Sequence, residues 1–187
     1  MLTRKDVSEA ILSLVTNKGD YVEVIWAIQE FNLAFDVKPN PSLYTKLVVE
    51  EVNEWVEELI NNGYSENLLK ETVDIIYVLE GLLAANPLEK LDISTDEDYL
   101  LNEALYLIKT IIAPMCELLF EDIEILDGFM ITHKSNMSKL GPDGKPIRRP
   151  EDNKVLKGPN YTPPDLSELI LNKETMVRAL RISMFDD

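Results

Sequence analysis

The sequence predicts an all-α protein with a single domain. Apolar residues recur at helical spacing through most of its 187 residues, and residues typical of helix starts and helix ends separate these stretches. Alternating runs of Val, Ile and Thr bounded by turns, which would indicate strands, are few. We expect one domain over residues 1–187, with a core of about residues 20–140, an arm over residues 141–164 and a closing helix over residues 165–183.

Four helices are expected in the first half of the chain. A polar residue that can accept a hydrogen bond from the free N–H groups of a first helical turn precedes each apolar stretch. The expected N-caps are Thr3, Asp20, Ser42 and Ser65, and the expected ranges are about 3–16, 20–35, 42–62 and 65–86. Lys18-Gly19-Asp20 is expected to separate the first two helices, and Gly63 to end the third.

The second half is expected to be one long helical stretch followed by an irregular segment. Thr95 opens the stretch, Pro114 kinks or restarts it, and helix continues to about residue 140. Residues 141–164 are rich in proline and glycine and have few apolar anchors, which predicts a loop or an ordered arm. The amphipathic pattern then returns and predicts the closing helix.

Composition excludes several classes of protein. The net charge of −16 argues against a general nucleic-acid binder, because neutralising phosphates requires a basic surface. No apolar run approaches the roughly 18 residues of a membrane span, so we expect no membrane association and a cytoplasmic location. The single cysteine, Cys116, rules out an intramolecular disulfide and a cysteine-based zinc cluster.

Four acidic residues form two pairs at helical spacing. Glu51 and Glu54 lie in the third expected helix, and Glu71 and Asp74 lie in the fourth. Residues three apart project from the same side of a helix, so two packed helices could direct all four carboxylates into one pocket. A hard divalent cation such as Mg²⁺ would offset the cost of holding these charges together.

The surroundings of these acids predict which of them are buried. Between Thr72 and Leu88 the only charged residues are Asp74 and Glu80, and a helix that is apolar nearly all round is buried. Asp74 is therefore an expected interior acid. In the third helix, a rotation of about 100° per residue directs Glu50 toward solvent.

A second candidate site lies near the end of the long helical stretch. His133, Asn136 and Lys139 are spaced three apart and should face one way, where the amide and the ammonium could donate to phosphate oxygens. Between residues 134 and 157 seven basic residues stand against three acidic ones. For His133 we expect hydrogen bonding or a structural role, and a single histidine argues against a di-iron bundle built on two Glu-x-x-His motifs.

Together these motifs resemble those of the all-α nucleoside triphosphate pyrophosphohydrolases, which include MazG-like proteins, dimeric dUTPases and phosphoribosyl-ATP pyrophosphohydrolase. The family pattern Glu-Glu-x-x-Glu followed by Glu-x-x-Asp is matched by residues 50–54 and 71–74, with sixteen residues between them. Residues 133–139, 143–146 and 157–166 are similar to the phosphate-contacting end and tail of MazG-like proteins often found in phages. The resemblance covers roughly residues 20–166.

The resemblance implies a function and a set of ligands. It implies a four-helix active core in a homodimer or dimer of dimers, and Mg²⁺-dependent hydrolysis of a nucleoside triphosphate, expected to be a deoxynucleoside triphosphate, to the monophosphate and pyrophosphate. We expect that Mn²⁺ can substitute for Mg²⁺ and that the location is the cytoplasm, which is the host cytoplasm if the protein is phage-encoded. Glu51, Glu54, Glu71 and Asp74 carry over as metal ligands. Glu50 is a candidate for helping to hold a metal or the attacking water, although the helical rotation directs it outward. Glu50, Glu51 and Glu54 are the candidate catalytic carboxylates, one of which would deprotonate the water.

The same resemblance assigns the substrate contacts. Asn136 and Lys139 would stabilise charge on the phosphates, and the basic arm would close over the triphosphate, with Lys157 and Tyr161 as its expected contacts. His133 belongs to the same stripe. Tyr77, like Trp26, Phe31 and Phe35, could stack on the base, although aromatic residues at helical spacing are more often part of a core.

Two alternatives remain open at this point. The first keeps the chemistry but takes phosphoribosyl-ATP as substrate, although the arm and the closing helix are superfluous for that compact family. The second is an acidic helical protein that binds a partner and has no enzymatic activity. Burial of Glu71 and Asp74 opposite Glu51 and Glu54 would count against the second alternative, because surface acids suffice for it.

Overall fold

The computed structural model describes residues 2–15, 17–150 and 155–170, and throughout these residues the regular structure is helical. The helices are α1 (Arg4–Leu14), α2 (Lys18–Ala34), α3 (Pro41–Asn62), α4 (Glu66–Ala85), α5 (Thr95–Leu107), the π-helical turn η1 (Ile108–Ile112), α6 (Ala113–Leu119) and α7 (Asp122–Met137). Pairing between extended segments is limited to isolated bridges in the described part. The all-α prediction is therefore confirmed. Only the first turn of the closing helix, residues 167–170, falls within the described residues.

Several helix ends lie where the capping residues predict them. Thr3 and Asp6 form a capping box at the start of α1, with the Thr3 hydroxyl 2.7 Å from the Asp6 carboxylate. The Ser65 hydroxyl accepts the Leu68 N–H at 3.0 Å and begins α4. Gly63 ends α3 with a φ of 66°, a backbone conformation that residues with a side chain rarely adopt.

The N-caps of α2 and α3 were predicted wrongly. Asn17, not Asp20, caps α2 by accepting the Gly19 N–H at 2.8 Å, so the predicted break is the first turn of the helix. Asn40, not Ser42, caps α3 and accepts the Leu43 N–H at 3.1 Å. Pro41 follows in the first helical turn, where its missing N–H costs nothing because that group would be unpaired there.

The predicted helical stretch from Thr95 to about residue 140 is interrupted near Pro114, where a kink or restart was predicted, and again at Phe120, where no break was predicted. A π-helical turn ends where α6 begins, and Pro114 in the first turn of α6 cannot donate a backbone hydrogen bond to the preceding turn. At Phe120 the backbone is extended, with φ −125° and ψ 151°. The buried Phe120 ring lies 5.6 Å from that of Tyr64, and a capping box at Glu121 then begins α7.

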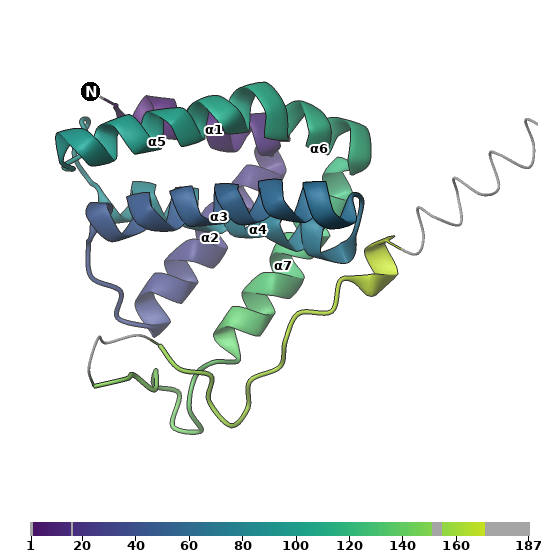
Figure 1. Ribbon diagram of the computed structural model, residues 1–187. Helices are drawn as coiled ribbons and strands as arrows, with labels where there is room; N and C mark the ends of the chain where they lie inside the picture. The colour runs from purple at the N-terminus through teal and green to yellow at the C-terminus, as the bar shows by residue number, and fades with distance from the viewer. Residues whose placement is uncertain (1, 16, 151–154, 171–187) are drawn as a thin grey trace, which may run out of the picture.

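The buried helix α4 lies at the centre of the molecule. It packs against α1, α2, α3 and α7, and α5 packs against α3. Figure 1 shows α3 and α4 between a layer formed by α1, α5 and α6 and the oblique pair α2 and α7. None of the described helices has the combination of length and apolar character that crossing a membrane requires.

Two close contacts fix α3 against α4. The fully buried Trp55 donates its indole N–H to the Thr72 hydroxyl at 2.9 Å. Toward the other end of the pair, a Cβ atom on Gly81 would overlap the ring of Tyr44, so only glycine permits this approach. On α3 the two contacts flank Glu51 and Glu54, and on α4 Thr72 lies between Glu71 and Asp74 in sequence, so the contacts hold the two helices together beside the acidic residues.

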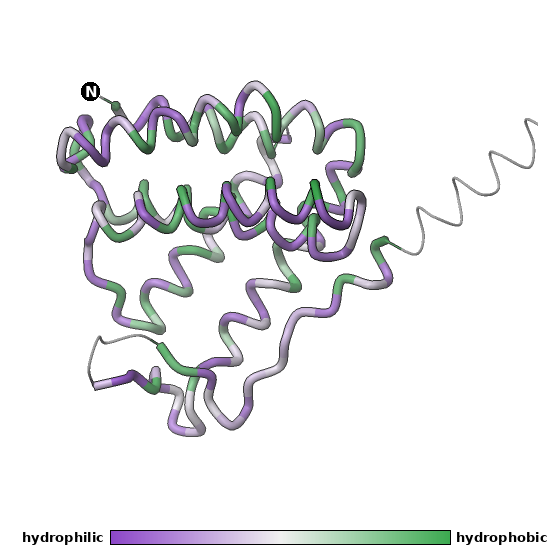
Figure 2. Tube along the Cα trace, viewed as in Figure 1, coloured by the Kyte–Doolittle hydropathy of each residue, from purple (hydrophilic) through white to green (hydrophobic). Residues whose placement is uncertain are grey.

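The described parts of the segment after α7, residues 138–150 and 155–166, are irregular but are held against the helices, and most of them are hydrophilic or neutral (Figure 2). The Ser135 hydroxyl donates to the Thr162 carbonyl at 2.7 Å, and the Thr162 N–H donates to the Ser138 hydroxyl at 2.9 Å. Farther along, Leu166 is buried and its N–H donates to the Glu66 carboxylate at 2.9 Å. The segment thus returns along α7 to the start of α4.

Candidate metal centre

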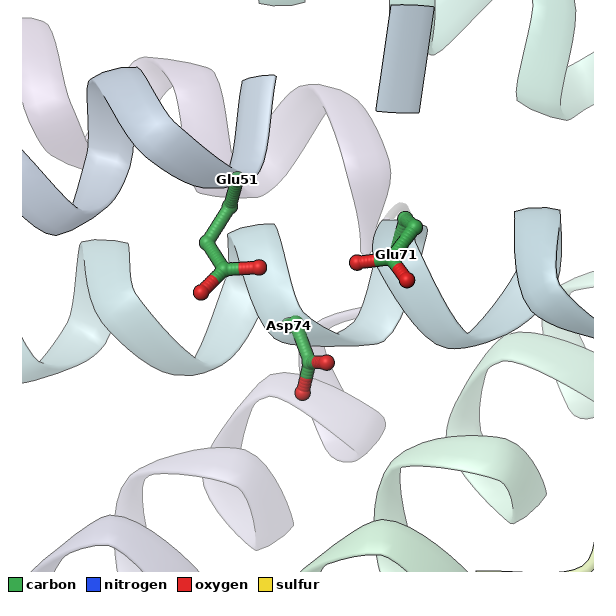
Figure 3. Close-up of side chains that lie close together, drawn as sticks. All are labelled: Glu51, Glu71 and Asp74. Carbon is green, nitrogen blue, oxygen red and sulfur yellow. The ribbon is translucent and has the colours of Figure 1, made fainter. Parts of the chain in front are cut away.

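Three carboxylates meet between α3 and α4. Glu51 reaches from α3 toward Glu71 and Asp74, which lie one turn apart on α4 (Figure 3). One carboxylate oxygen from each residue lies within 4.8 Å of the others. Oxygens on opposite sides of a bound Mg²⁺ or Ca²⁺ are roughly 4–5 Å apart, so these three could ligate one divalent cation.

The group is largely shielded from water. The Glu71 side chain is 12% exposed and that of Asp74 is 20% exposed. The Oε2 atom of Glu71 is buried and accepts no hydrogen bond within the described part of the chain. An unpaired buried carboxylate oxygen is unfavourable, and a cation between the three residues would satisfy it.

The acids affect one another's protonation. Burial raises the pKa of Glu51 to about 8, and the negative charges of Asp74, Glu54 and Glu71 act in the same direction. Burial also raises the pKa of Glu71, aided by Asp74 and Glu54 and opposed by Lys70. The metal-free group therefore retains a proton near neutral pH, which a bound cation would displace.

We expect Glu51 to make the metal-free protein less stable as pH rises from about 4.5 to about 8. In this range unfolded Glu51 has released its proton whereas folded Glu51 retains it, so the free energy of unfolding falls with pH. Burial of Glu80, whose pKa rises to about 7, adds to the same slope. Urea unfolding in EDTA at several pH values measures the effect.

The variant Glu51→Gln isolates this contribution from the general repulsion of an acidic chain. Its stability relative to the parent should increase between pH 5 and pH 8 and then level off. Glu57→Gln, which removes an exposed acid from the same helix, is the control and should show no such increase. A parent and a Glu51→Gln variant with parallel pH profiles would contradict the prediction.

Lys70 is a component of this group that was not predicted from the sequence. Its ammonium lies 2.6 Å from Asp74 Oδ2 and 3.1 Å from Glu71 Oε1. Burial alone would lower the pKa of Lys70, but the charges and hydrogen bonds of Asp74 and Glu71 outweigh it and raise the pKa. The i,i+4 spacing of Lys70 and Asp74 was the available signal, since such pairs contact each other on a helix.

The other two acids of the first motif lie outside the group of three. Glu54 is exposed, although it is close enough for its charge to raise the pKa of both Glu51 and Glu71. Glu50 is exposed as well, as its helical position predicts. The structure therefore places Glu54 at the edge of the site and Glu50 on the outer side of α3.

Asn136 and Lys139 lie together at the C-terminal end of α7. The Lys139 ammonium donates to Asn136 Oδ1 at 2.6 Å and is partly buried. Burial lowers the pKa of Lys139, and Lys157 and Lys70 act in the same direction. The negative charge of Asp74 opposes this shift, so Lys139 lies within electrostatic range of the acidic group.

Residues 157–161 place two further predicted contacts beside Lys139. The Lys157 ammonium lies 4.5 Å from the centre of the Tyr161 ring, an arrangement that favours a cation–π interaction. A Cβ atom on Gly158 would lie 3.0 Å from the Lys139 carbonyl oxygen, which shows how closely this backbone approaches α7. The structure thus brings together basic residues that are far apart in the sequence.

His133 and Tyr77 belong to an aromatic cluster between α2, α4 and α7. His133 is buried, with Nε2 3.1 Å from Glu30 Oε2 and Nδ1 3.3 Å from the Tyr77 hydroxyl. The Tyr77 ring lies 5.5 Å from the rings of both Phe31 and Phe129. These contacts give His133 a hydrogen-bonding, structural position.

The other aromatic candidates divide between this cluster and the surface. Phe35 is buried and stacks on Phe31 with ring centres 4.3 Å apart, so it extends the cluster. Trp26 on α2 is 67% exposed and lies outside it. Burial raises the pKa of Tyr77 above its usual range, and Asp74, one turn away on α4, adds to this shift.

The fold and the site define a helical protein in which Glu51, Glu71 and Asp74 could hold a divalent cation beside a group of lysines. Comparisons with protein-family models, curated proteins and solved structures found no match for the chain. The functional inference therefore depends on the residues of the site and on their geometry.

Proposed function

We propose that this protein is a Mg²⁺-dependent nucleoside triphosphate pyrophosphohydrolase. The observation that carries the proposal is the meeting of Glu51 with Glu71 and Asp74, beside Lys139 and Lys157. Carboxylates suit a hard divalent cation, and ammonium groups suit phosphate oxygens. A nucleoside triphosphate bound with Mg²⁺ combines both partners in one ligand.

We also propose that α2, α3, α4 and α7 form a four-helix active core. The packing of α4 against the other three helices, and of α2 against α7, supports this assignment. In this proposal α1, α5 and α6 cover the core, and residues 141–164 form the basic arm, of which residues 151–154 lie outside the described part of the chain. A homodimer or dimer of dimers, which the family resemblance implies, stays a prediction.

The residues of the site suggest how the reaction would proceed. Glu51, Glu71 and Asp74 would hold the metal, whose positive charge would polarise the phosphates. Lys139 and Lys157 would bind phosphate oxygens and stabilise the charge that develops in the transition state. Glu54, at the exposed edge beside this group, would complete the ligand set or accept the proton of the attacking water.

A substrate panel tests this proposal directly. Purified protein is incubated with Mg²⁺ or Mn²⁺ and each of the common nucleoside and deoxynucleoside triphosphates, and the products are separated by ion-exchange chromatography. Equal amounts of monophosphate and pyrophosphate are expected from at least one substrate. Release of orthophosphate with formation of diphosphate, or no turnover at all, would overturn the proposal.

The same panel distinguishes the two alternatives. Phosphoribosyl-ATP is included as a substrate, and its exclusive hydrolysis would identify the protein as a phosphoribosyl-ATP pyrophosphohydrolase. A non-enzymatic acidic protein would hydrolyse nothing. The low exposure of the Glu71 and Asp74 side chains, 12% and 20%, supports an enzyme, because acids that mimic nucleic-acid charge or bind a partner are expected at the surface.

Replacing Lys139 by Ala should lower kcat/KM for the best triphosphate by at least ~10-fold, about 1.4 kcal/mol in transition-state stabilisation. Charge-assisted bonds to phosphate are stronger than neutral hydrogen bonds, and Lys139 is the partly buried lysine beside the acidic group. Lys134→Ala is the matched control, since Lys134 is an exposed lysine on α7, five residues before Lys139. Equal, small effects of the two substitutions at saturating Mg²⁺ would contradict the assignment.

A further inference from the structure

Lys70 contacts the acidic group directly. Its ammonium contacts Asp74 and Glu71 together, at 2.6 and 3.1 Å, and these are two of the three candidate ligands. A cation bonded to the same two oxygens would lie in the same space between them. The ammonium does not satisfy the whole group, because Glu71 Oε2 remains buried without a hydrogen bond in the described residues.

An ammonium and a divalent cation cannot share this space. Two positive charges a few ångströms apart repel each other strongly where the surroundings are partly shielded from water. Lys70 can withdraw, because its side chain is 36% exposed and has four rotatable carbon–carbon bonds. The side chains of Glu71 and Asp74 are shorter and only 12% and 20% exposed, so they cannot follow the ammonium into solvent.

We propose that Lys70 is an internal counter-ion that holds the acidic group together without metal and that a divalent cation must displace. Lys70 thereby sets the metal concentration at which the site fills. This inference rests on the proposed metal site and adds a residue that opposes its occupation. It predicts opposite effects of losing Lys70 on the metal-free and the metal-bound protein.

Mn²⁺ binding to the full-length protein, followed by the electron paramagnetic resonance signal of free Mn²⁺, tests the proposal. Lys70→Gln should lower the Kd for Mn²⁺ by roughly 5-fold or more, because it removes a positive charge from the site. Lys5→Gln is the matched control. Lys5 pairs with Glu9 at the same i,i+4 spacing, with N and O 3.6 Å apart, but its side chain is 79% exposed and lies on α1. The substitution Lys5→Gln should therefore leave the Kd for Mn²⁺ within about twofold of the parental value.

Thermal unfolding provides a second readout. In EDTA, Lys70→Gln should have a lower Tm than the parent because the acids lose their counter-ion. Saturating Mn²⁺ should raise its Tm by more than it raises that of the parent, since ligand stabilisation increases with affinity. Lys70→Arg keeps the positive charge and should bind Mn²⁺ no more tightly than the parent. If Lys70→Gln folds poorly, tighter Mn²⁺ binding by Lys70→Arg would still contradict the proposal.

The outcomes separate this inference from the proposed function. Mn²⁺ binding that is lost in Asp74→Asn but unchanged or weaker in Lys70→Gln would overturn the role of Lys70 and leave the metal site standing. Absence of Mn²⁺ binding to the parent would overturn both. Tighter binding by Lys70→Gln together with loss of binding in Asp74→Asn would support both.

Discussion

Replacing Asp74 by Asn should reduce triphosphate hydrolysis by roughly 1000-fold or more, about 4 kcal/mol in transition-state stabilisation. Asp74 lies in the centre of the candidate metal site, and its carboxylate is within 4.8 Å of those of Glu51 and Glu71. An amide of the same shape removes the negative charge while filling the same space. The rate of pyrophosphate release at saturating Mg²⁺ measures the loss.

The control for this prediction is Glu57→Gln, the same chemical change at an exposed position on α3. It should retain parental activity. Circular dichroism should show unchanged helix content in Asp74→Asn, because Lys70 keeps its ion pair with Glu71 and the repulsion on Glu51 is relieved. Parental activity in Asp74→Asn would remove the acidic group from the mechanism.

Replacing Trp55 by Ala should lower the free energy of unfolding by about 3–5 kcal/mol. Trp55 is fully buried between α3 and α4, and its truncation leaves a large cavity. Trp55→Phe keeps most of the volume but loses the hydrogen bond to Thr72, so it should cost less, about 1–2 kcal/mol. Urea unfolding followed by circular dichroism measures both changes.

Trp26→Ala is the matched control for Trp55→Ala. Trp26 is 67% exposed, so its removal should change stability by no more than ~0.5 kcal/mol. Similar losses for the two substitutions would show that Trp55 does not hold α3 against α4. A weaker Mn²⁺ affinity in Trp55→Phe would further link this contact to the spacing of the three acids.

Much of the fold was predictable because local signals and tertiary packing agree. Thr3, Ser65 and Gly63 lie at the ends of their helices as their side chains or backbone preferences require. The errors arose where two capping candidates compete. Asn17 and Asn40 each precede the residue that was predicted, and asparagine caps a helix at least as well as aspartate or serine.

The break between α6 and α7 could not be predicted from periodicity. It depends on Phe120, whose ring is buried beside Tyr64 from the connection between α3 and α4. A contact between residues so far apart in the sequence has no local signature. The helical pattern through this region continues without Gly or Pro, so the sequence alone favours an unbroken helix.

The sequence predicted which side of each helix carries the acidic residues, but it did not predict which of these residues contact one another. Helical spacing places Glu71 and Asp74 on one side of α4, and the structure shows that Glu51 of α3 meets them there. Contacts at Trp55 and Gly81 hold α3 against α4, and Glu54 lies exposed at the edge of the site. The hydrogen bond between His133 and Glu30, which is 103 residues earlier, likewise cannot be predicted from helical spacing.

The attachment of residues 155–166 has a consequence for the entropy of binding. Gly158 lies against the carbonyl of Lys139, Thr162 is bonded to Ser135 and Ser138, and Leu166 is buried. The conformational entropy of this segment is therefore lost when the protein folds, before any ligand arrives. A phosphate that met Lys157 and Tyr161 would find its partners already in place, so its binding energy would not be reduced by ordering a mobile loop.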